Sequence, residues 1–204
     1  MDLFSDGSPT ELLPHGGSAV LHPWILGEAS AATTFDEVLG AVEWVQHRLT
    51  MFGRLLDEPR LSAWYGDHPY TYSGVPRDPL PWNEPLSRLR GICERITGSA
   101  FNTVLANLYR DGSDSMGWHA DDEPELGPSP VIASVSLGAP RRFKLRHRDS
   151  GETVECRLPP GSLLVMSGAC QRRWTHAVPK EKRVSEPRIN LTYRFIDPAA
   201  VRRS

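Results

Sequence analysis

The chain has 204 residues, 39% of them hydrophobic and 24% charged, which suits one soluble domain with a sizeable core. Its formal net charge of −2 excludes a strongly basic nucleic-acid binder, although a local basic patch is compatible with it. Three widely spaced cysteines, Cys93, Cys156 and Cys170, argue against a disulfide framework or a zinc finger and indicate a reducing compartment.

The N-terminal residues lack the basic and apolar regions of a signal peptide, and no apolar run approaches the ~20 residues of a membrane span. We therefore predict a cytoplasmic protein that makes no use of membranes. Residues 1–18 are polar and aperiodic, which predicts a flexible N-terminal arm before a single domain over 19–204. Short extended segments are expected at 19–22 and 24–26.

Two amphipathic helices are predicted in the first half of the chain. Apolar residues recur at three- and four-residue spacing over about 30–49 and again over about 84–97. Gly98 provides the C-terminal stop of the second helix. Between the two helices, residues of about 50–80 are rich in aromatics, proline and glycine, so this stretch should be extended and turn-bearing.

The second half of the chain has the pattern of strands. Alternating or β-branched runs predict strands at 101–109, 131–137, 142–147, 153–158, 163–166 and 188–195. Turn residues at 149–151 join two of these runs as a hairpin. Two helices followed by about eight short strands predict an α+β fold, a double-stranded β-helix (jelly roll) braced by N-terminal helices.

A histidine and a carboxylate stand one residue apart in the sequence Gly117–Glu123. If this stretch is a strand, His119 and Asp121 leave the same face and could hold one metal ion together. His176 is the best candidate for a third ligand. Two histidines and one carboxylate are the ligand set of non-haem Fe(II) oxygenases, which keep positions open for substrate and dioxygen.

The last predicted strand alternates strictly between polar and apolar residues. Its polar face carries Arg188, Asn190, Thr192 and Arg194. This face could simply be the solvated side of an edge strand. Alternatively it points into the barrel, where two buried arginines would need anions because a buried unpaired charge is costly. A dicarboxylate cosubstrate would satisfy them, since guanidinium pairs bidentately with carboxylate.

Together these motifs resemble the AlkB family of Fe(II)- and 2-oxoglutarate-dependent dioxygenases, in its nucleic-acid demethylase branch. The resemblance covers about residues 50–196. It rests on the metal-ligand pattern and the arginine strand, and on the segments 107–109, 118–123, 132–138 and 161–166. Upstream, the segments 59–66 and 70–73 resemble the substrate lid of these enzymes, which places a nucleotide-recognition lid at about 50–80.

The resemblance implies Fe(II), 2-oxoglutarate and dioxygen as cofactors, with iron held by His119, Asp121 and His176. Arg188 would pair with the distal carboxylate of 2-oxoglutarate, assisted by Asn107 and Tyr109. Arg194 would lie near the carboxylate bound at the metal, and Asn190 and Thr192 would line the same pocket. Asn107 could instead be a turn residue.

The resemblance also implies contacts with a damaged base. Asp122 would read its exocyclic nitrogen, with Glu123 beside it, although both could be solvated acids. The lid would supply Tyr70, Tyr72, Ser73 and Trp64, and His119 would offer a second flat surface. Phosphate-facing charge could come from Arg54, Arg60, Arg141, Arg142, Arg146, His147 and Arg148.

The implied reaction is oxidative N-demethylation of N1-methyladenine or N3-methylcytosine in DNA or RNA, which releases succinate, carbon dioxide and formaldehyde. The target base must leave the stack to be reached. Two alternatives stay open: a dioxygenase that acts on a protein or small molecule, and a metal-free jelly-roll binding module. The lid stretch argues against the first, and the triad with the arginine strand argues against the second.

Strand preference depends on Phe52, which stands next to Met51 and is followed by Arg54. An exposed apolar residue beside a basic one could act as a wedge between base steps of a duplex. Phe52 could equally anchor the end of the first helix. The lid sequence resembles single-strand-acting relatives at least as closely, so we expect a monomeric enzyme that favours single-stranded substrates.

Overall fold

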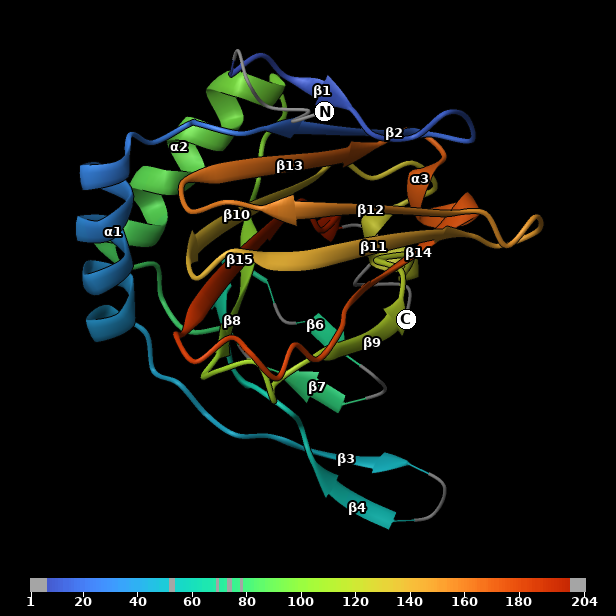
Figure 1. The fold of residues 1–204 in the computed structure, drawn as a ribbon. Helices are drawn as coiled ribbons and strands as arrows, with labels where there is room; N and C mark the ends of the chain where they lie inside the picture. Colours follow the sequence, from blue (N-terminus) through green and yellow to red (C-terminus); the bar gives the residue numbers. More distant parts are fainter. Residues whose placement is uncertain (1–6, 52–53, 69, 73–74, 78, 199–204) are drawn as a thin grey trace.

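The structure is a computed structural model that describes residues 7–51, 54–68, 70–72, 75–77 and 79–198. Its main body is two antiparallel sheets. The larger sheet has the strand order β1-β2-β13-β10-β15-β8-β5, and the smaller one the order β12-β11-β14-β9. Figure 1 shows the two sheets stacked as layers, with helices along one side. The jelly-roll architecture predicted from the sequence is therefore confirmed.

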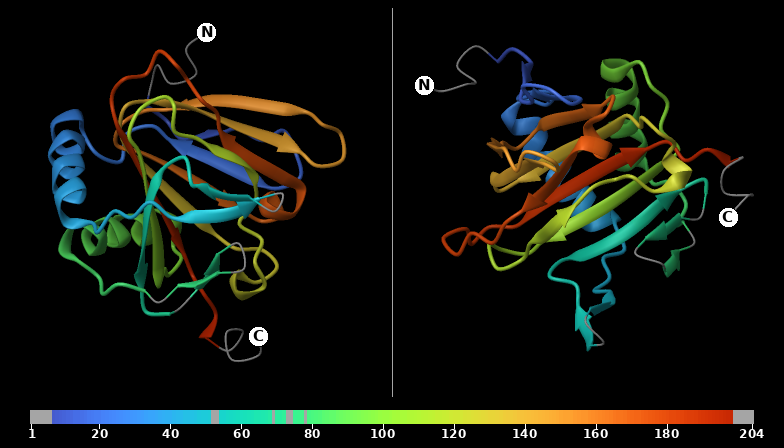
Figure 2. Two further views of the ribbon diagram at one scale, coloured as in Figure 1. Left: turned by 90° about the horizontal axis from the view of Figure 1, so that it is seen from below. Right: turned by 90° about the vertical axis from the view of Figure 1, so that its right-hand side faces the viewer.

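The strands of the larger sheet are β1 (Thr10–Glu11), β2 (Ser18–His22), β5 (Leu61–Gly66), β8 (Thr103–Tyr109), β10 (Ile132–Gly138), β13 (Ser162–Ser167) and β15 (Arg188–Arg194). Those of the smaller sheet are β9 (Met116–His119), β11 (Arg141–His147), β12 (Thr153–Leu158) and β14 (Trp174–Val178). Two hairpins lie outside both sheets: β3 (Arg48–Met51) with β4 (Arg54–Asp57), and β6 (Tyr70–Tyr72) with β7 (Val75–Arg77). Figures 1 and 2 show the β3–β4 hairpin projecting from the body.

Strand alternation gives the larger sheet two buried faces. On β8, Leu105 and Tyr109 point into the space between the sheets, where they join a core with Phe143 of β11. The intervening residues of β8, Ala106 and Leu108, pack against the helices on the other face. A sheet covered on both sides explains why every residue of β8 and β15 is buried.

Helices α1 (Glu28–Ala41) and α2 (Glu84–Thr97) cover the outer face of the larger sheet. The bounds of α2 agree with the sequence prediction, including Gly98 in the left-handed conformation at φ 67°. The helix predicted over 30–49 is shorter and ends at Ala41. Val45 instead forms a bridge with Ser62, because the exposed edge of β5 offers the backbone hydrogen-bond partners that the helix would otherwise supply.

The N-terminal segment differs from the predicted flexible arm over its described residues 7–18. Thr10 and Glu11 pair with β2, and Leu13 is buried in the core between the sheets. The short extended segment expected at 24–26 forms no strand, because the backbone there donates to the carbonyl of Gly161 without forming a ladder. Among the described residues, no helix is long and apolar enough to cross a membrane.

Candidate metal and cosubstrate site

The two histidines of the predicted triad lie on neighbouring strands of the smaller sheet. His119 on β9 and His176 on β14 are directly opposite each other, with ring centroids 4.2 Å apart. Asp121 completes the cluster, and one ligand atom from each residue lies within 4.8 Å of the others. The strand argument was wrong for Asp121, because β9 ends at His119 and the carboxylate comes from the loop that follows.

Hydrogen bonds from neighbouring groups orient two of the metal-ligand residues, His119 and Asp121. His119 Nδ1 lies 2.8 Å from the carbonyl oxygen of Gly117, so Nδ1–H donates there and Nε2 is left to face the cluster. The backbone N–H of Asp121 donates to Oε1 of Gln171, which is buried on helix α3 (Cys170–Arg173). Because Asp121 lies outside β9, this hydrogen bond rather than strand pairing orients its carboxylate.

Electrostatics favour the ligand forms of all three residues. Burial lowers the pKa of His176 to about 3, with a further contribution from His119, and burial also lowers the pKa of His119. Burial alone would raise the pKa of Asp121, but Arg194, which donates to its Oδ1, reverses this effect and lowers it. Two neutral imidazoles beside one carboxylate are the protonation states that bind a divalent metal.

The arginine strand is central rather than an edge. β15 lies between β10 and β8, with Asn190 opposite Asn107 and Arg188 opposite Tyr109. The solvated-edge alternative is therefore wrong, and the polar face points between the sheets. Arg194, at the end of that face, contacts the cluster of metal-ligand residues through an ion pair with Asp121.

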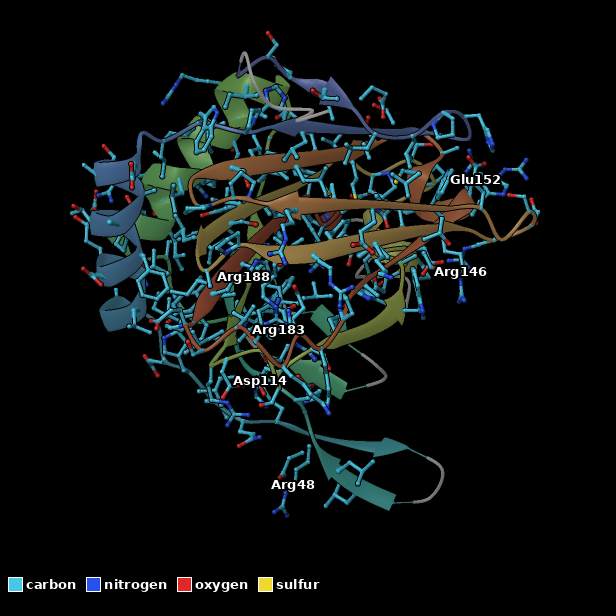
Figure 3. All side chains as sticks on the ribbon, viewed as in Figure 1. Arg48, Asp114, Arg146, Glu152, Arg183 and Arg188 are labelled. Atoms are coloured by element: carbon cyan, nitrogen blue, oxygen red, sulfur yellow. The ribbon has the colours of Figure 1, made fainter. Side chains whose placement is uncertain are left out.

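Arg188 is almost fully buried, at 1% exposure, and Figure 3 shows it inside the body of the molecule. Its Nη2 donates to Oγ of Ser136 at 2.9 Å, and its Cζ lies 5.2 Å from the centre of the Tyr109 ring. Nε and Nη1 have no hydrogen-bond partner among the described residues. A buried guanidinium with two unused donors is a natural carboxylate site.

One cavity brings together most of the predicted metal and cosubstrate residues. Its walls include the three metal-ligand candidates and five of the six predicted cosubstrate residues, namely Asn107, Tyr109, Asn190, Thr192 and Arg194. Arg188 lies beyond it, next to Tyr109. The sequence reasoning missed several wall residues and supports, among them Ser134, Ser136, Phe143, Met166 and Gln171. Ser134 and Ser136 could be found only from the register of β10 against β15, and the other three only from the packing of β11, β13 and α3 around the cavity, which the sequence alone does not give.

Four residues predicted to contact nucleic acid belong instead to the interior. Arg60, at 3% exposure, donates through Nε to Oδ1 of Asn107 and pairs with Glu58. Trp64 is equally buried and packs in the core between the sheets. Arg141 and His147 are also buried, at 1% and 8%. Arg141 and His147 lie at inward positions of β11, Trp64 lies on the buried strand β5, and Arg60 is held inside by Glu58 and Asn107.

Other predicted substrate residues lie at the surface or outside the described set. Asp122 is exposed and pairs with Arg148, whereas Glu123 is partly buried where a 3-10 turn (Pro124–Leu126) begins. Phe52 and Ser73 lie outside the described residues, and the side chains of Arg54, Tyr70 and Tyr72 are likewise not described. The wedge and lid predictions therefore stay predictions.

A sequence model of the 2OG-Fe(II) oxygenase superfamily matches residues 17–194. The chain is 42% identical to the alpha-ketoglutarate-dependent dioxygenase alkB homolog 3 of Homo sapiens, over 92% of this chain and 69% of that protein. It is 44% identical to the DNA oxidative demethylase ALKBH2 of Mus musculus, over 85% of this chain and 78% of that protein. The solved structure of OsALKBH1 has the same fold, with a TM-score of 0.64 at 16% identity, over 91% of this chain and 100% of that one.

The fold, the two-histidine-one-carboxylate cluster and the arginine-bearing strand define a non-haem iron oxygenase that uses a 2-oxo acid. The chain belongs to the AlkB family within the 2OG-Fe(II) oxygenase superfamily, and it is an Fe(II)- and 2-oxoglutarate-dependent dioxygenase. The residues present fit both cofactors: the cluster has the donor set for Fe(II), and Arg188 has unused buried donors for a carboxylate.

Proposed function

We propose that this enzyme removes methyl groups oxidatively from N1-methyladenine and N3-methylcytosine in DNA or RNA, as a direct reversal of alkylation damage. The observation that carries the proposal is the metal-ligand cluster at one end of β15, joined to buried Arg188 at the other end. Relatives with 41–44% identity that are named DNA oxidative demethylases support the choice of substrate.

In this proposal, His119, Asp121 and His176 hold Fe(II), which with 2-oxoglutarate supplies the oxidation of the substrate methyl group by dioxygen. Arg188 binds the distal carboxylate of 2-oxoglutarate through its unused donors, and Ser136 fixes the orientation of its guanidinium. The remaining predicted cosubstrate residues act from the cavity wall: Asn107, Tyr109, Asn190, Thr192 and Arg194.

Arg60 acts on the cosubstrate site indirectly, because it orients the amide of Asn107. Its Nε–H is bound to Oδ1 of Asn107, so the amide of Asn107 turns its Nδ2 donors away from Arg60. Arg194 has a related task at the other end of β15, since its contact with Asp121 keeps that carboxylate ionised and oriented.

A polyanionic substrate is consistent with the charge of the surface. Cationic side chains gather around a groove formed by one end of β11 and β12 and by the loop after β14: Arg142, Arg157, Lys180, Lys182 and Arg183, of which the first two pair with Glu181. Asp122, next to the ligand Asp121, is exposed and could accept a hydrogen bond from the exocyclic amine of a flipped base. We further propose a cytoplasmic monomer, in keeping with three free, buried cysteines.

The experiment is an assay with Fe(II), 2-oxoglutarate and matched oligonucleotides, single- and double-stranded, each with one N1-methyladenine, one N3-methylcytosine or no modification. We expect succinate and formaldehyde to form in equal amounts with the methylated strands, and mass spectrometry to show the loss of one methyl group. The control is Arg188→Ala, which should be inactive at ordinary 2-oxoglutarate concentrations. Succinate release that methylated strands fail to stimulate would assign the enzyme to another substrate class.

A further inference from the structure

An exposed tryptophan lies directly beside the metal-ligand cluster. Trp118 precedes His119 on β9 and leaves 41% of its surface open to solvent. Its indole is covered on one side by Arg146 of β11, whose Cζ lies 4.3 Å from the ring centroid. Figure 3 shows Arg146 at the surface near one end of the sheets, well away from buried Arg188.

The contact with Arg146 puts Trp118 on the outer face of the smaller sheet. The register of β9 with β14 shifts between His176 and Val178, and both Met116 and His119 line the cavity, so the Arg146 contact rather than regular alternation decides the face of Trp118. On β11, Leu145 is buried opposite His176, and Arg146 is exposed opposite Thr175. β9 is the edge strand of this sheet. Only the width of one edge strand therefore separates the outer Trp118 ring from the cavity that holds the triad.

Arg146 differs from the neighbouring cations on and just after its strand. Lys144 pairs with Glu155, and Arg148 pairs with Asp122. Arg146, by contrast, makes no ion pair of 4 Å or less within the part of the chain that the structure describes. An accessible indole with a guanidinium across it combines an apolar flat surface with positive charge. Those are the two properties that proteins use to bind single-stranded nucleic acid.

We infer that Trp118 and Arg146 form a stacking platform for an unpaired base next to the target base, with the Arg146 guanidinium also close to the phosphate that joins them. This inference rests on the proposed function and extends it. The target base would enter the cavity from one side of β9, and its neighbour would stack on the other side. A neighbour that stacks on Trp118 cannot stay paired, so the platform favours single strands over duplexes.

The test measures binding separately from turnover. Fluorescence anisotropy of a short labelled single strand with one N3-methylcytosine gives the affinity for wild-type protein and for Trp118→Ala. We expect Trp118→Ala to weaken binding roughly 5- to 150-fold, the range for loss of one base–aromatic stack. Arg146→Ala should weaken it less, and Trp118→Phe should keep part of the affinity.

Abasic oligonucleotides make the test specific. An abasic site replaces the neighbouring base 5′ or 3′ of the methylated base, in separate oligonucleotides. At the position whose base stacks on Trp118, it should weaken binding to wild-type protein by the same factor as Trp118→Ala. The two changes together should then add nothing further. Trp24→Ala is the matched control, because Trp24 is also exposed, at 55%, but lies far from β9 in the chain and outside the smaller sheet.

The outcomes separate the platform from its alternatives. Equal binding by wild-type protein and Trp118→Ala, or the same loss with and without the neighbouring base, would overturn the inference. A thermal midpoint of Trp118→Ala well below that of Trp24→Ala, with no base dependence, would show that the indole only supports the sheet. Absence of any methyl-dependent turnover by wild-type protein would instead refute the proposed function.

Discussion

At the scale of single residues, the site depends on two buried arginines of β15 whose charges are compensated differently. Burial lowers the pKa of the Arg188 guanidinium, which means that the protein interior holds this charge at an electrostatic cost. A carboxylate from the cosubstrate would relieve that cost. Asp121 is the opposite case, since Arg194 already compensates it. The two arginines of β15 thus have different tasks, although the sequence presents them as one alternating pattern.

We predict that Arg188→Ala raises the apparent KM for 2-oxoglutarate by a factor that corresponds to roughly 2–5 kcal/mol. Ser136→Ala removes only the hydrogen bond that orients the guanidinium, so its effect should be near 1 kcal/mol. Steady-state kinetics with varied 2-oxoglutarate, together with equilibrium binding of 2-oxoglutarate, measures both. A normal 2-oxoglutarate affinity in Arg188→Ala would remove this residue from the cosubstrate site.

At the scale of elements, the sequence predicted correctly those helices and strands whose bounds depend on neighbouring residues in the chain. The bounds of α2 followed from apolar spacing and from Gly98, and the strand Thr153–Leu158 followed from alternation around a turn. Asp121 could not be placed correctly, because its orientation depends on Gln171, fifty positions later in the chain. The end of α1 likewise depends on the edge of β5, a tertiary contact.

The start of α2 offers a direct test of one local signal. Oδ1 of Asn83 accepts from the backbone N–H of Leu86, and Nδ2 donates to the carbonyl of Ala41 at the end of α1. Asn83→Ala should lower the free energy of unfolding by about 1 kcal/mol. Asn83→Asp keeps the cap and loses the link to α1, so chemical denaturation of both variants separates the two contacts. Equal stability of Asn83→Ala and wild-type protein would mean that the cap contributes nothing.

At the Arg188 end of the barrel, Arg141 links two loop segments. Arg141 donates to the carbonyls of Asp111, Asp114 and Pro179, and it pairs with Glu181. The turn after β8 is thereby tied to the loop before β15. These two segments adjoin Tyr109 and Arg188, so the Arg141 clamp also fixes the wall of the cosubstrate site.

Glu181 makes this clamp sensitive to acid. Burial alone would raise its pKa, but the backbone N–H of Arg142 and three arginine side chains lower it below 4.5. The ionised carboxylate therefore stabilises the fold fully above pH 4.5, and the stabilisation disappears as pH falls through the folded-state pKa. We predict that Glu181→Gln costs roughly 1–3 kcal/mol near neutral pH and less in acid.

Denaturation curves from neutral to acidic pH measure this difference. Glu155→Gln is the control, because Glu155 is half-exposed and its pair with Lys144 should contribute little at any pH. A constant gap between wild-type protein and Glu181→Gln across the range would show that the charge of Glu181 does not stabilise the clamp.

At the scale of the whole molecule, the site exists only because the two sheets face each other. The three ligands come from β9, the loop after it and β14 on the side of the smaller sheet, whereas Arg188 and Arg194 come from the middle of the larger one. The sequence revealed these residues as motifs and the family resemblance supplied their roles. Which buried neighbours orient them, such as Ser136 and Arg60, follows from strand register, which needs the assembled sheets.

Because Fe(II) would be held on the side of the smaller sheet and 2-oxoglutarate by Arg188 of the larger one, the bound cofactors should stabilise the packing of the two sheets. A ligand present at 100 times its dissociation constant adds about 2.7 kcal/mol when it binds only the folded state. For a chain of this size that corresponds to a rise in Tm of about 5–10 °C. We predict such a rise for wild-type protein with Mn²⁺, a redox-inert substitute for Fe(II), together with 2-oxoglutarate. His176→Ala should lose most of the response to both, whereas Arg188→Ala should respond to Mn²⁺ and lose the further rise with 2-oxoglutarate. If both variants responded like wild-type protein, the ligands would bind elsewhere, and the cluster between the sheets would not be the cofactor site.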